Sequence, residues 1–171
     1  MIRSLMASTY LVNDAQIPTV GYGTMLFPDP ERAVDLIQGA LRCGYRHIDT
    51  ARKYGSEEWV GEGIRTSGLA REDIWVTTKV TEENAKADDF QRSVDTSLKT
   101  LDLDYIDLLL IHWPQPKVPL EETLGALAHA KRQGLAKNIG VSNFTVALLD
   151  EAVTNRSNSS FSSSFFCNFR W

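Results

Sequence analysis

Four polar side chains of complementary chemistry stand at or just after the ends of short apolar runs. Asp49 closes the run "YRHID", Lys79 closes "IWVTTK" and His112 closes "DLLLIH", while Tyr54 follows Asp49 by five residues. If these runs are neighbouring parallel strands, their carboxyl ends meet at one edge of a sheet. A tyrosine, a lysine, an aspartate and a histidine gathered there could transfer a proton to a developing alkoxide.

Each of the four residues would have a role in that transfer. The Tyr54 hydroxyl is a weak acid with a pKa of about 10, and a neighbouring Lys79 ammonium is expected to lower that pKa. Asp49 would keep the ammonium charged and oriented. His112 would donate a hydrogen bond to the substrate oxygen. Because no protein side chain supplies hydride, reduction of a carbonyl at this site implies a nicotinamide cofactor.

Other interpretations remain open for the residues taken singly. Asp49 could be a loop acid, Tyr54 a packing aromatic and His112 a core histidine, whereas a desolvated Lys79 needs a partner. Lys79 could also form a Schiff base in a sugar-phosphate isomerase or an aldolase. The joint placement of the four favours the reductive set. The two remaining histidines, His47 and His129, are interpreted as structural.

The elements that must position these residues repeat as strand–helix units. Apolar runs at residues 19–25, 45–50, 74–80, 105–113 and 136–144 predict strands, and amphipathic stretches at 29–44, 56–68, 87–101, 119–134 and 145–153 predict helices. Ser56 is the predicted N-cap of the second helix, and Gly44 is the predicted C-cap of the first. A further hairpin is predicted from residues 9–12 and 16–20.

This α/β pattern fits either an open doubly wound sheet or a barrel of parallel strands. The dinucleotide-binding fingerprint of the first architecture is absent, because the segments that begin at Gly21 and Gly61 lack a third glycine. A complete barrel has eight units and takes about 250 residues. We therefore expect a partial (β/α)8 TIM barrel with an N-terminal β-hairpin and about five of the eight units.

Composition limits the partners of the chain. The 171 residues include 18 Lys and Arg against 22 Asp and Glu, a formal net charge of −4, which disfavours nucleic acid and acidic membranes as partners. No run is apolar enough for a membrane span and no signal peptide is evident, so we expect a cytoplasmic protein. Cys43 and Cys167 lack metal-ligand spacing, and no metal site is predicted.

The chain changes character after residue 154. Residues 155–171 are rich in serine and phenylalanine and show no helical or alternating period. We expect residues 1–154 to form the N-terminal part of the barrel, and residues 155–171 to be an aberrant, disordered tail of a C-terminally truncated chain. Such a piece would expose its first and fifth strands as edges, through which it could self-associate.

Several motifs, in order along the chain, resemble the aldo-keto reductase family. They are "GYGT", "HIDTARKYGSEEWVGEGI", "IWVTTKV", "DLLLIHWP" and "IGVSNF", all within residues 8–153. The resemblance is nearest to the bacterial branch that reduces 2,5-diketo-D-gluconate and other small aldehydes. It implies a (β/α)8 barrel, NADP(H) as cofactor, a small carbonyl compound as substrate and, for full-length relatives, a monomer.

The resemblance also implies residue roles. The family's catalytic tetrad maps onto Asp49, Tyr54, Lys79 and His112, with Tyr54 as the proton donor. The other implied positions are Ser142 and Asn143 at the nicotinamide carboxamide, Gly23, Thr24 and Asp49 along the cofactor, and Trp113 with His112 at the substrate.

Two functions are compatible with these motifs. The first is NADPH-dependent reduction of aldehydes or ketones to alcohols. The second is a non-catalytic member of the family that acts as a binding or regulatory piece, since the family's strands six to eight carry further cofactor contacts that this sequence does not supply.

Overall fold

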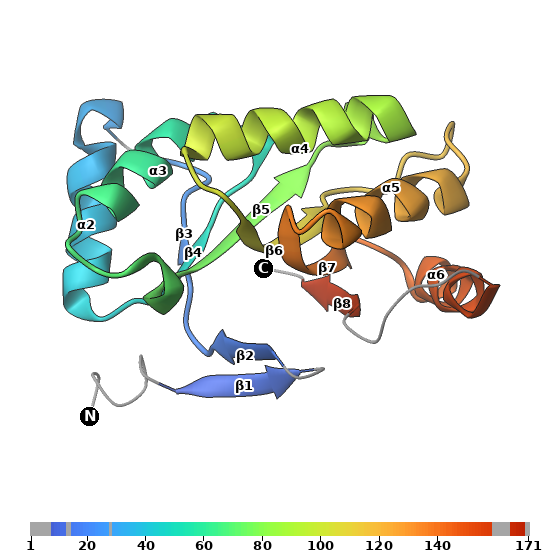
Figure 1. Ribbon diagram of the computed structural model, residues 1–171, viewed down its shortest axis with the longest axis horizontal. Helices are drawn as coiled ribbons and strands as arrows, with labels where there is room; N and C mark the ends of the chain where they lie inside the picture. The colour runs from blue at the N-terminus through green and yellow to red at the C-terminus, as the bar shows by residue number, and fades with distance from the viewer. Residues whose placement is uncertain (1–7, 13–14, 28, 159–164, 170–171) are drawn as a thin grey trace.

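The computed structural model describes residues 8–12, 15–27, 29–158 and 165–169 (Figure 1). The strands are β1 (Thr9–Val12), β2 (Ala15–Pro18), β3 (Tyr22–Gly23), β4 (His47–Asp49), β5 (Trp75–Val80), β6 (Ile106–Ile111), β7 (Ala136–Ser142) and β8 (Phe165–Phe169). The helices are α2 (Ala33–Cys43), α3 (Glu57–Arg65), α4 (Ala87–Leu101), α5 (Leu120–Arg132) and α6 (Val146–Asn158), with short 3-10 helices η1 (Pro30–Arg32), η2 (Arg52–Tyr54), η3 (Arg71–Asp73) and η4 (Glu82–Asn84).

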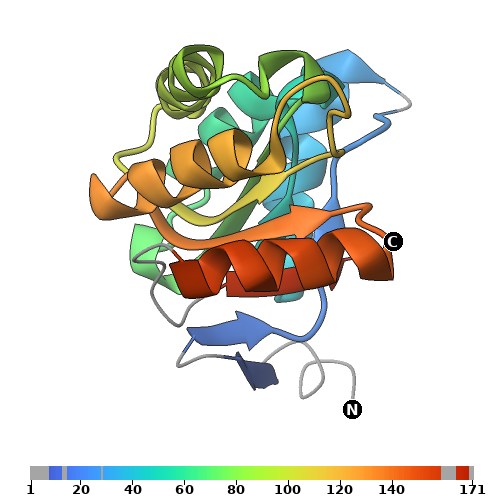
Figure 2. The same cartoon turned by 90° about the vertical axis from the view of Figure 1, so that its right-hand side faces the viewer.

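Strands β3 to β8 form one parallel sheet in chain order. Because the order never reverses, every crossover advances in the same direction, as in the wall of a barrel and unlike a doubly wound sheet. Helices α4 and α5 lie side by side along this sheet (Figures 1 and 2). The predicted α/β fold with an N-terminal hairpin is confirmed.

Side chains alternate across the sheet, and one face buries its residues under the helices. Leu109 and Ile111 of β6 cluster with Leu124 and Leu127 of α5. At the other end of the sheet, strand residues cluster with the apolar faces of α2 and α3; the members include Ile37, Leu41, Ile48, Val60, Ile64 and Val76. Apolar residues that recur every second position in the strands therefore pack against apolar residues that recur about every 3.6 positions in the helices, as the sequence pattern predicts.

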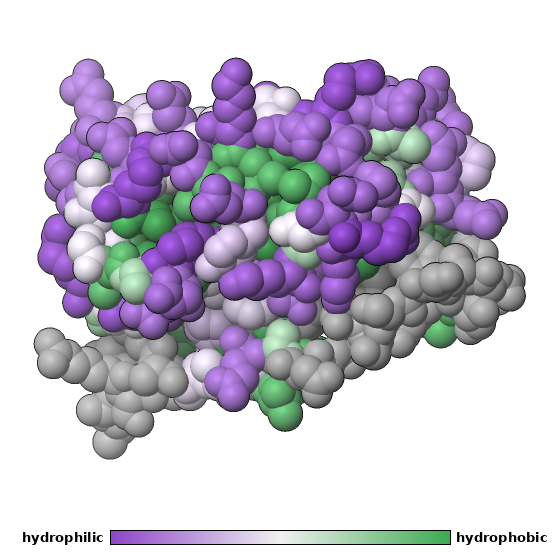
Figure 3. All heavy atoms as spheres, viewed as in Figure 1, coloured by the Kyte–Doolittle hydropathy of each residue, from purple (hydrophilic) through white to green (hydrophobic). Residues whose placement is uncertain are grey.

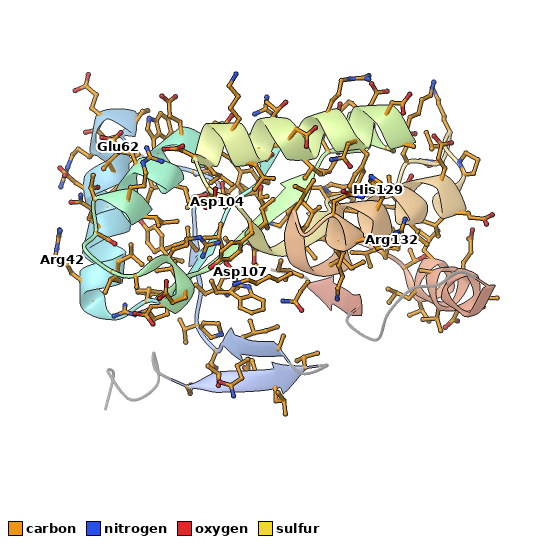
Figure 4. All side chains as sticks on the ribbon, in the orientation of Figure 1. Arg42, Glu62, Asp104, Asp107, His129 and Arg132 are labelled. Atoms are coloured by element: carbon orange, nitrogen blue, oxygen red, sulfur yellow. The ribbon has the colours of Figure 1, made fainter. Side chains whose placement is uncertain are left out.

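The hairpin of β1 and β2 packs at the amino-terminal ends of the sheet strands, where it is set apart from the helices in Figure 2. Its Ile17 clusters with Leu108 and Leu110, which face away from the helices. Asp107 lies at this same end (Figure 4) and accepts hydrogen bonds from Arg71 Nη2 at 2.6 Å and from the Val76 amide at 3.0 Å. The hairpin therefore leaves uncovered the opposite end of the sheet, where the strands have their carboxyl ends and where the polar residues singled out above are expected.

Both predicted cap residues lie at the expected helix ends, but only the C-cap Gly44 makes the capping hydrogen bonds. Gly44 ends α2 with φ of 105°, a left-handed conformation that glycine adopts without steric cost, and its amide bonds back into the last turn. Ser56 precedes α3, but its side chain makes no capping hydrogen bond. Its hydroxyl instead contacts Thr24 and Thr50, because the helix begins against the buried ends of β3 and β4.

The structure also differs from the expected disordered tail. Helix α6 runs to Asn158, past the predicted boundary at residue 154, and Phe165–Phe169 form β8, which pairs in parallel with β7. An unpaired strand edge is a template for another strand, and phenylalanine favours strands. The predicted exposed edge at the fifth strand is therefore wrong, since β8 covers it; the division of the chain at residue 154 stays a prediction.

The helices turn hydrophilic side chains outward over much of the face in Figure 3. Among the described residues, no helix combines the length and the apolar character that crossing a membrane requires. The same residues contain no group of three or more His, Cys, Asp or Glu side chains arranged to hold a metal ion.

Candidate active site

Lys79 and Asp49 form the buried centre of the site. Parallel pairing sets Asp49 beside Thr77, which places Lys79 two residues further along β5 at the same end of the sheet. Lys79 Nζ donates to Asp49 Oδ1 at 2.7 Å and to the Thr50 carbonyl at 2.9 Å. The Lys79 side chain is only 1% exposed. A buried ammonium requires such partners, so the predicted pairing of the two residues agrees with the geometry.

Tyr54 is brought over this ion pair by the 3-10 helix η2. The helix ends at Gly55 with φ of 66°, and the Tyr54 amide bonds to the Ala51 carbonyl at 3.0 Å, which folds the loop back over β4. Lys79 Nζ lies 3.5 Å from the Tyr54 hydroxyl, the limit of a hydrogen bond, and 5.1 Å from the ring centroid. The ammonium therefore faces both the hydroxyl and the ring.

His112 completes the group of four. It follows β6, and its amide donates to the Val80 carbonyl at 2.9 Å. Its ring meets the Tyr54 ring edge to face, with 5.6 Å between centroids and 79° between planes. Among the described residues no hydrogen-bond partner of His112 Nδ1 is found. Burial and, to a smaller extent, the Lys79 charge lower the pKa of His112 to about 4, so the imidazole is neutral near pH 7.

Burial also governs the other three titrating groups. It lowers the pKa of Lys79, opposed by Asp49, and raises the pKa of Asp49, opposed by Lys79. Burial and the Asp49 charge raise the pKa of Tyr54. The expected lowering of the Tyr54 pKa is therefore wrong in direction, because burial and the Asp49 charge together raise this pKa.

Asn143 ties the end of β7 to the end of β6. It has φ of 61°, a left-handed conformation that asparagine tolerates better than most residues. Its Nδ2 donates to the His112 carbonyl at 2.8 Å and lies 3.1 Å from Ser142 Oγ. Ser142 itself is buried at the end of β7. The predicted pair of residues therefore lies beside the histidine.

A series of hydrogen-bonded side-chain hydroxyls supports the site next to Asp49, and the sequence did not reveal it. Ser56 Oγ lies 2.9 Å from Thr24 Oγ1 and 3.0 Å from Thr50 Oγ1, and Thr24 Oγ1 donates to the Asp49 carbonyl at 3.1 Å. These three hydroxyl side chains are buried, and Thr50 carries the carbonyl that accepts from Lys79. The local signal for Ser56, a serine before a helix, is shared with ordinary caps.

Glu57 is a second support that the sequence did not reveal. This buried carboxylate accepts from Thr78 Oγ1 at 2.7 Å and lies 3.5 Å from Arg52 Nη1. Thr78 precedes Lys79, and Arg52 lies two residues before Tyr54. Glu57 therefore connects the strand of the lysine with the helix of the tyrosine.

The strand ends that form the site lie within a longer sequence pattern that covers most of the chain. The sequence profile described as "Aldo/keto reductase family" matches residues 19–165. The chain belongs to the aldo/keto reductase family.

Several aldo/keto reductases are similar to the chain over most of its length. The methylglyoxal reductase DkgB of Salmonella typhi is 44% identical over 139 residues, 80% of this chain and 52% of that protein. The glyoxal reductase of Bacillus subtilis is 40% identical over 151 residues, 88% and 54% of the two chains. The chain thus spans about half the length of these curated relatives.

Solved aldo/keto reductase structures have the same fold. One named after 2,5-diketo-D-gluconic acid reductase B superposes with a TM-score of 0.87 at 37% identity, covering 99% of this chain and 59% of that one. The Bombyx mori aldo-keto reductase, solved in complex with NADP, gives a TM-score of 0.82 at 33% identity, covering 95% and 59%.

The remaining residues that the family pattern singles out lie at the same end of the sheet. Gly23 pairs with Asp49, is exposed, and a Cβ added to it would meet no atom within 4 Å, so the space above it is open. Thr24 is buried and its hydroxyl faces inward, as described above. Trp113 is 48% exposed and follows His112 at the rim.

Proposed function

We propose that this chain carries the active site of an NADPH-dependent carbonyl reductase, which reduces small aldehydes or ketones to alcohols. One observation carries the proposal: a buried ammonium, Lys79 Nζ, lies 3.5 Å from the Tyr54 hydroxyl and 2.7 Å from the Asp49 carboxylate. This arrangement suits a phenol that gives up a proton beside a fixed positive charge.

The residues of the site would handle the proton. A carbonyl oxygen placed between Tyr54 and His112 accepts hydrogen bonds from the phenol and from the neutral imidazole. Since the pKa of Tyr54 is raised by burial, the phenol is protonated near pH 7 and can act as an acid. As negative charge develops on the substrate oxygen, Tyr54 donates its proton. The Lys79 ammonium stabilises the phenolate that remains, and Asp49 keeps the ammonium in place.

The residues present fit the nicotinamide end of the cofactor. Ser142 and Asn143 offer a hydroxyl and an amide at the end of β7, beside the strand that ends at His112. Gly23 and Asp49 border the open space at the end of β3, and a side chain at position 23 would occupy that space. When bound there, nicotinamide supplies the hydride that no protein side chain can supply.

Small dicarbonyl compounds are the proposed substrates. The relatives named above are a methylglyoxal reductase and a glyoxal reductase. Exposed apolar side chains follow the carboxyl ends of two of the strands that carry the site: Met25 and Leu26 after β3, and Trp113 after β6. These side chains carry no charge and suit a small uncharged substrate.

Consumption of NADPH with methylglyoxal tests this proposal, with Tyr54→Phe as the matched variant. The substitution removes the hydroxyl and retains the ring that packs on His112. We expect a fall in kcat of about a hundredfold or more, in the range that general acid catalysis contributes, with the melting temperature little changed. Equal turnover by the two proteins would refute the role of Tyr54.

A fluorescence titration with NADPH separates catalysis from a purely binding or regulatory role. The non-catalytic alternative predicts little or no binding of NADPH to the unsubstituted chain, so tight one-to-one binding would refute that alternative.

A further inference from the structure

An ion pair joins two loops at the mouth of the site. Lys53, in η2, precedes the tyrosine, and Glu82 begins η4 after β5. Lys53 Nζ donates to Glu82 Oε1 at 2.8 Å. The two side chains are 50% and 26% exposed, respectively, so the pair faces solvent at the entrance. The hydrogen bond lowers the pKa of Glu82 and raises that of Lys53, so both groups are charged near pH 7.

The pair lies within electrostatic range of the reacting groups. The charges of Glu82 and Lys53 act in opposite directions on the pKa of His112, after the larger effects of burial and Lys79. Gln115, two residues beyond Trp113, donates its Nε2 to the Glu82 carbonyl at 3.3 Å. The loops that follow β4, β5 and β6 therefore meet at Glu82.

The cationic side chains at this side of the entrance are already paired with carboxylates. The loop between β4 and α3 carries two cations: Arg52 contacts Glu57, and Lys53 contacts Glu82. Deeper in the site, Lys79 contacts Asp49. Glu83, next to Glu82, is exposed and adds a further negative charge. A substrate carboxylate approaching this loop would meet cations that are already paired, beside an unmatched acid.

We propose that Glu82 determines substrate charge specificity: by holding Lys53, it makes the site select neutral carbonyl compounds over keto acids and other anionic carbonyl compounds, which would distinguish this chain from relatives that reduce the anionic 2,5-diketo-D-gluconate. This inference rests on the proposed function and names the substrate class of the same site. Because an exposed ion pair is weak, the selection comes from where the charges are placed. Lys53 without Glu82 would offer an unmatched ammonium beside Tyr54.

Glyoxylate and methylglyoxal test this directly, since both present a small aldehyde and only glyoxylate carries a carboxylate. We expect Glu82→Gln to raise the ratio of kcat/KM for glyoxylate to kcat/KM for methylglyoxal by about fivefold to tenfold, because the released Lys53 ammonium would exert a partly screened attraction on the substrate carboxylate. The increase should shrink as salt is added.

Two variants control for charge in general. Glu83→Gln removes the same charge one residue away without releasing Lys53, so we expect a much smaller change in the ratio. The double variant Lys53→Met/Glu82→Gln should lose the increase. An unchanged ratio in Glu82→Gln, an equal increase in Glu83→Gln, or an increase that persists in the double variant would each overturn the inference.

A binding measurement separates this inference from the proposed function. If no variant, nor the unsubstituted chain, consumes NADPH with methylglyoxal, the proposed function fails. The inference is then decided by titrating glyoxylate into isotope-labelled lysine protein, with the Lys53 signal assigned from Lys53→Met. A shift of that signal in Glu82→Gln and none in the unsubstituted chain supports the inference; the same response in both overturns it.

Discussion

Replacement of Ser56 by alanine probes the hydroxyl chain beneath the site. Each hydroxyl has one proton. Thr24 donates its proton to the Asp49 carbonyl, so Ser56 must donate to Thr24, and Thr50 must donate to Ser56. Ser56→Ala therefore removes two hydrogen bonds and leaves the buried Thr50 hydroxyl without its acceptor.

The expected cost follows from that count. Two net hydrogen bonds at about 1 kcal/mol each, with one buried donor left unsatisfied, give a loss of about 2–3 kcal/mol in the free energy of unfolding. For a chain of this length the melting temperature should fall by about 5–10 °C. Urea unfolding monitored by circular dichroism measures the free energy, and calorimetry measures the melting temperature.

Ser93→Ala is the matched control. Ser93 is also buried, in α4, but no hydrogen-bond partner of its hydroxyl is found among the described residues. Alanine there should be neutral or stabilising by about 0.5 kcal/mol, since alanine favours helix. The assignment of the hydroxyl chain would be refuted if Ser56→Ala lost less than about 0.5 kcal/mol, or no more than Ser93→Ala.

Three further outcomes are expected. Lys79→Met should destabilise the fold by about 3–5 kcal/mol, because it leaves Asp49 buried without its cation; in urea unfolding, Lys79→Met/Asp49→Asn should recover part of this loss, and no recovery would contradict the pairing. Burial lowers the pKa of His47 to about 4 in the folded chain, against about 6.5 when unfolded. Between these values the unfolded state binds more protons, so the free energy of unfolding should fall by up to about 3 kcal/mol as pH drops from about 6.5 to 4. If the free energy of unfolding of a His47→Asn variant fell as steeply with pH, His47 would be excluded as the source. A Cβ at Gly61 would lie 2.0 Å from the Leu101 carbonyl oxygen, whereas one at Gly125 meets nothing within 4 Å. Thermal melts should therefore show that Gly61→Ala is destabilised and that Gly125→Ala is stabilised by about 0.5–1 kcal/mol. Similar melting temperatures for the two variants would contradict the close approach of α3 to the end of α4.

The elements and the central ion pair could be predicted because their signals are local or follow from register. Periodicity located the five α-helices of the described residues, and parallel pairing of adjacent strands sufficed to bring Asp49 to Lys79. The role of Ser56 could not be predicted in the same way. A serine before a helix has the same local pattern whether it caps the helix or faces buried threonines, and only the packing of β3 against β4 decides between the two.

Two other features depended on surroundings that a sequence does not display. The pKa of Tyr54 is raised by burial and by the Asp49 charge, so knowing that Lys79 is a neighbour was not enough to fix the direction of the shift. Strand β8 forms against an edge offered by β7, and no period within the tail revealed that pairing.

The strand order has a consequence for how the chain reaches this state. Each pairing in the register from β4 through β7 joins residues about 30 positions apart, so closing each successive loop has nearly the same entropic cost. The sheet can then assemble by accretion, one strand and one helix at a time, each addition completing a surface for the next. Asp49 and Lys79 belong to consecutive units, so their ion pair can form early, before the last strands of the sheet have been added.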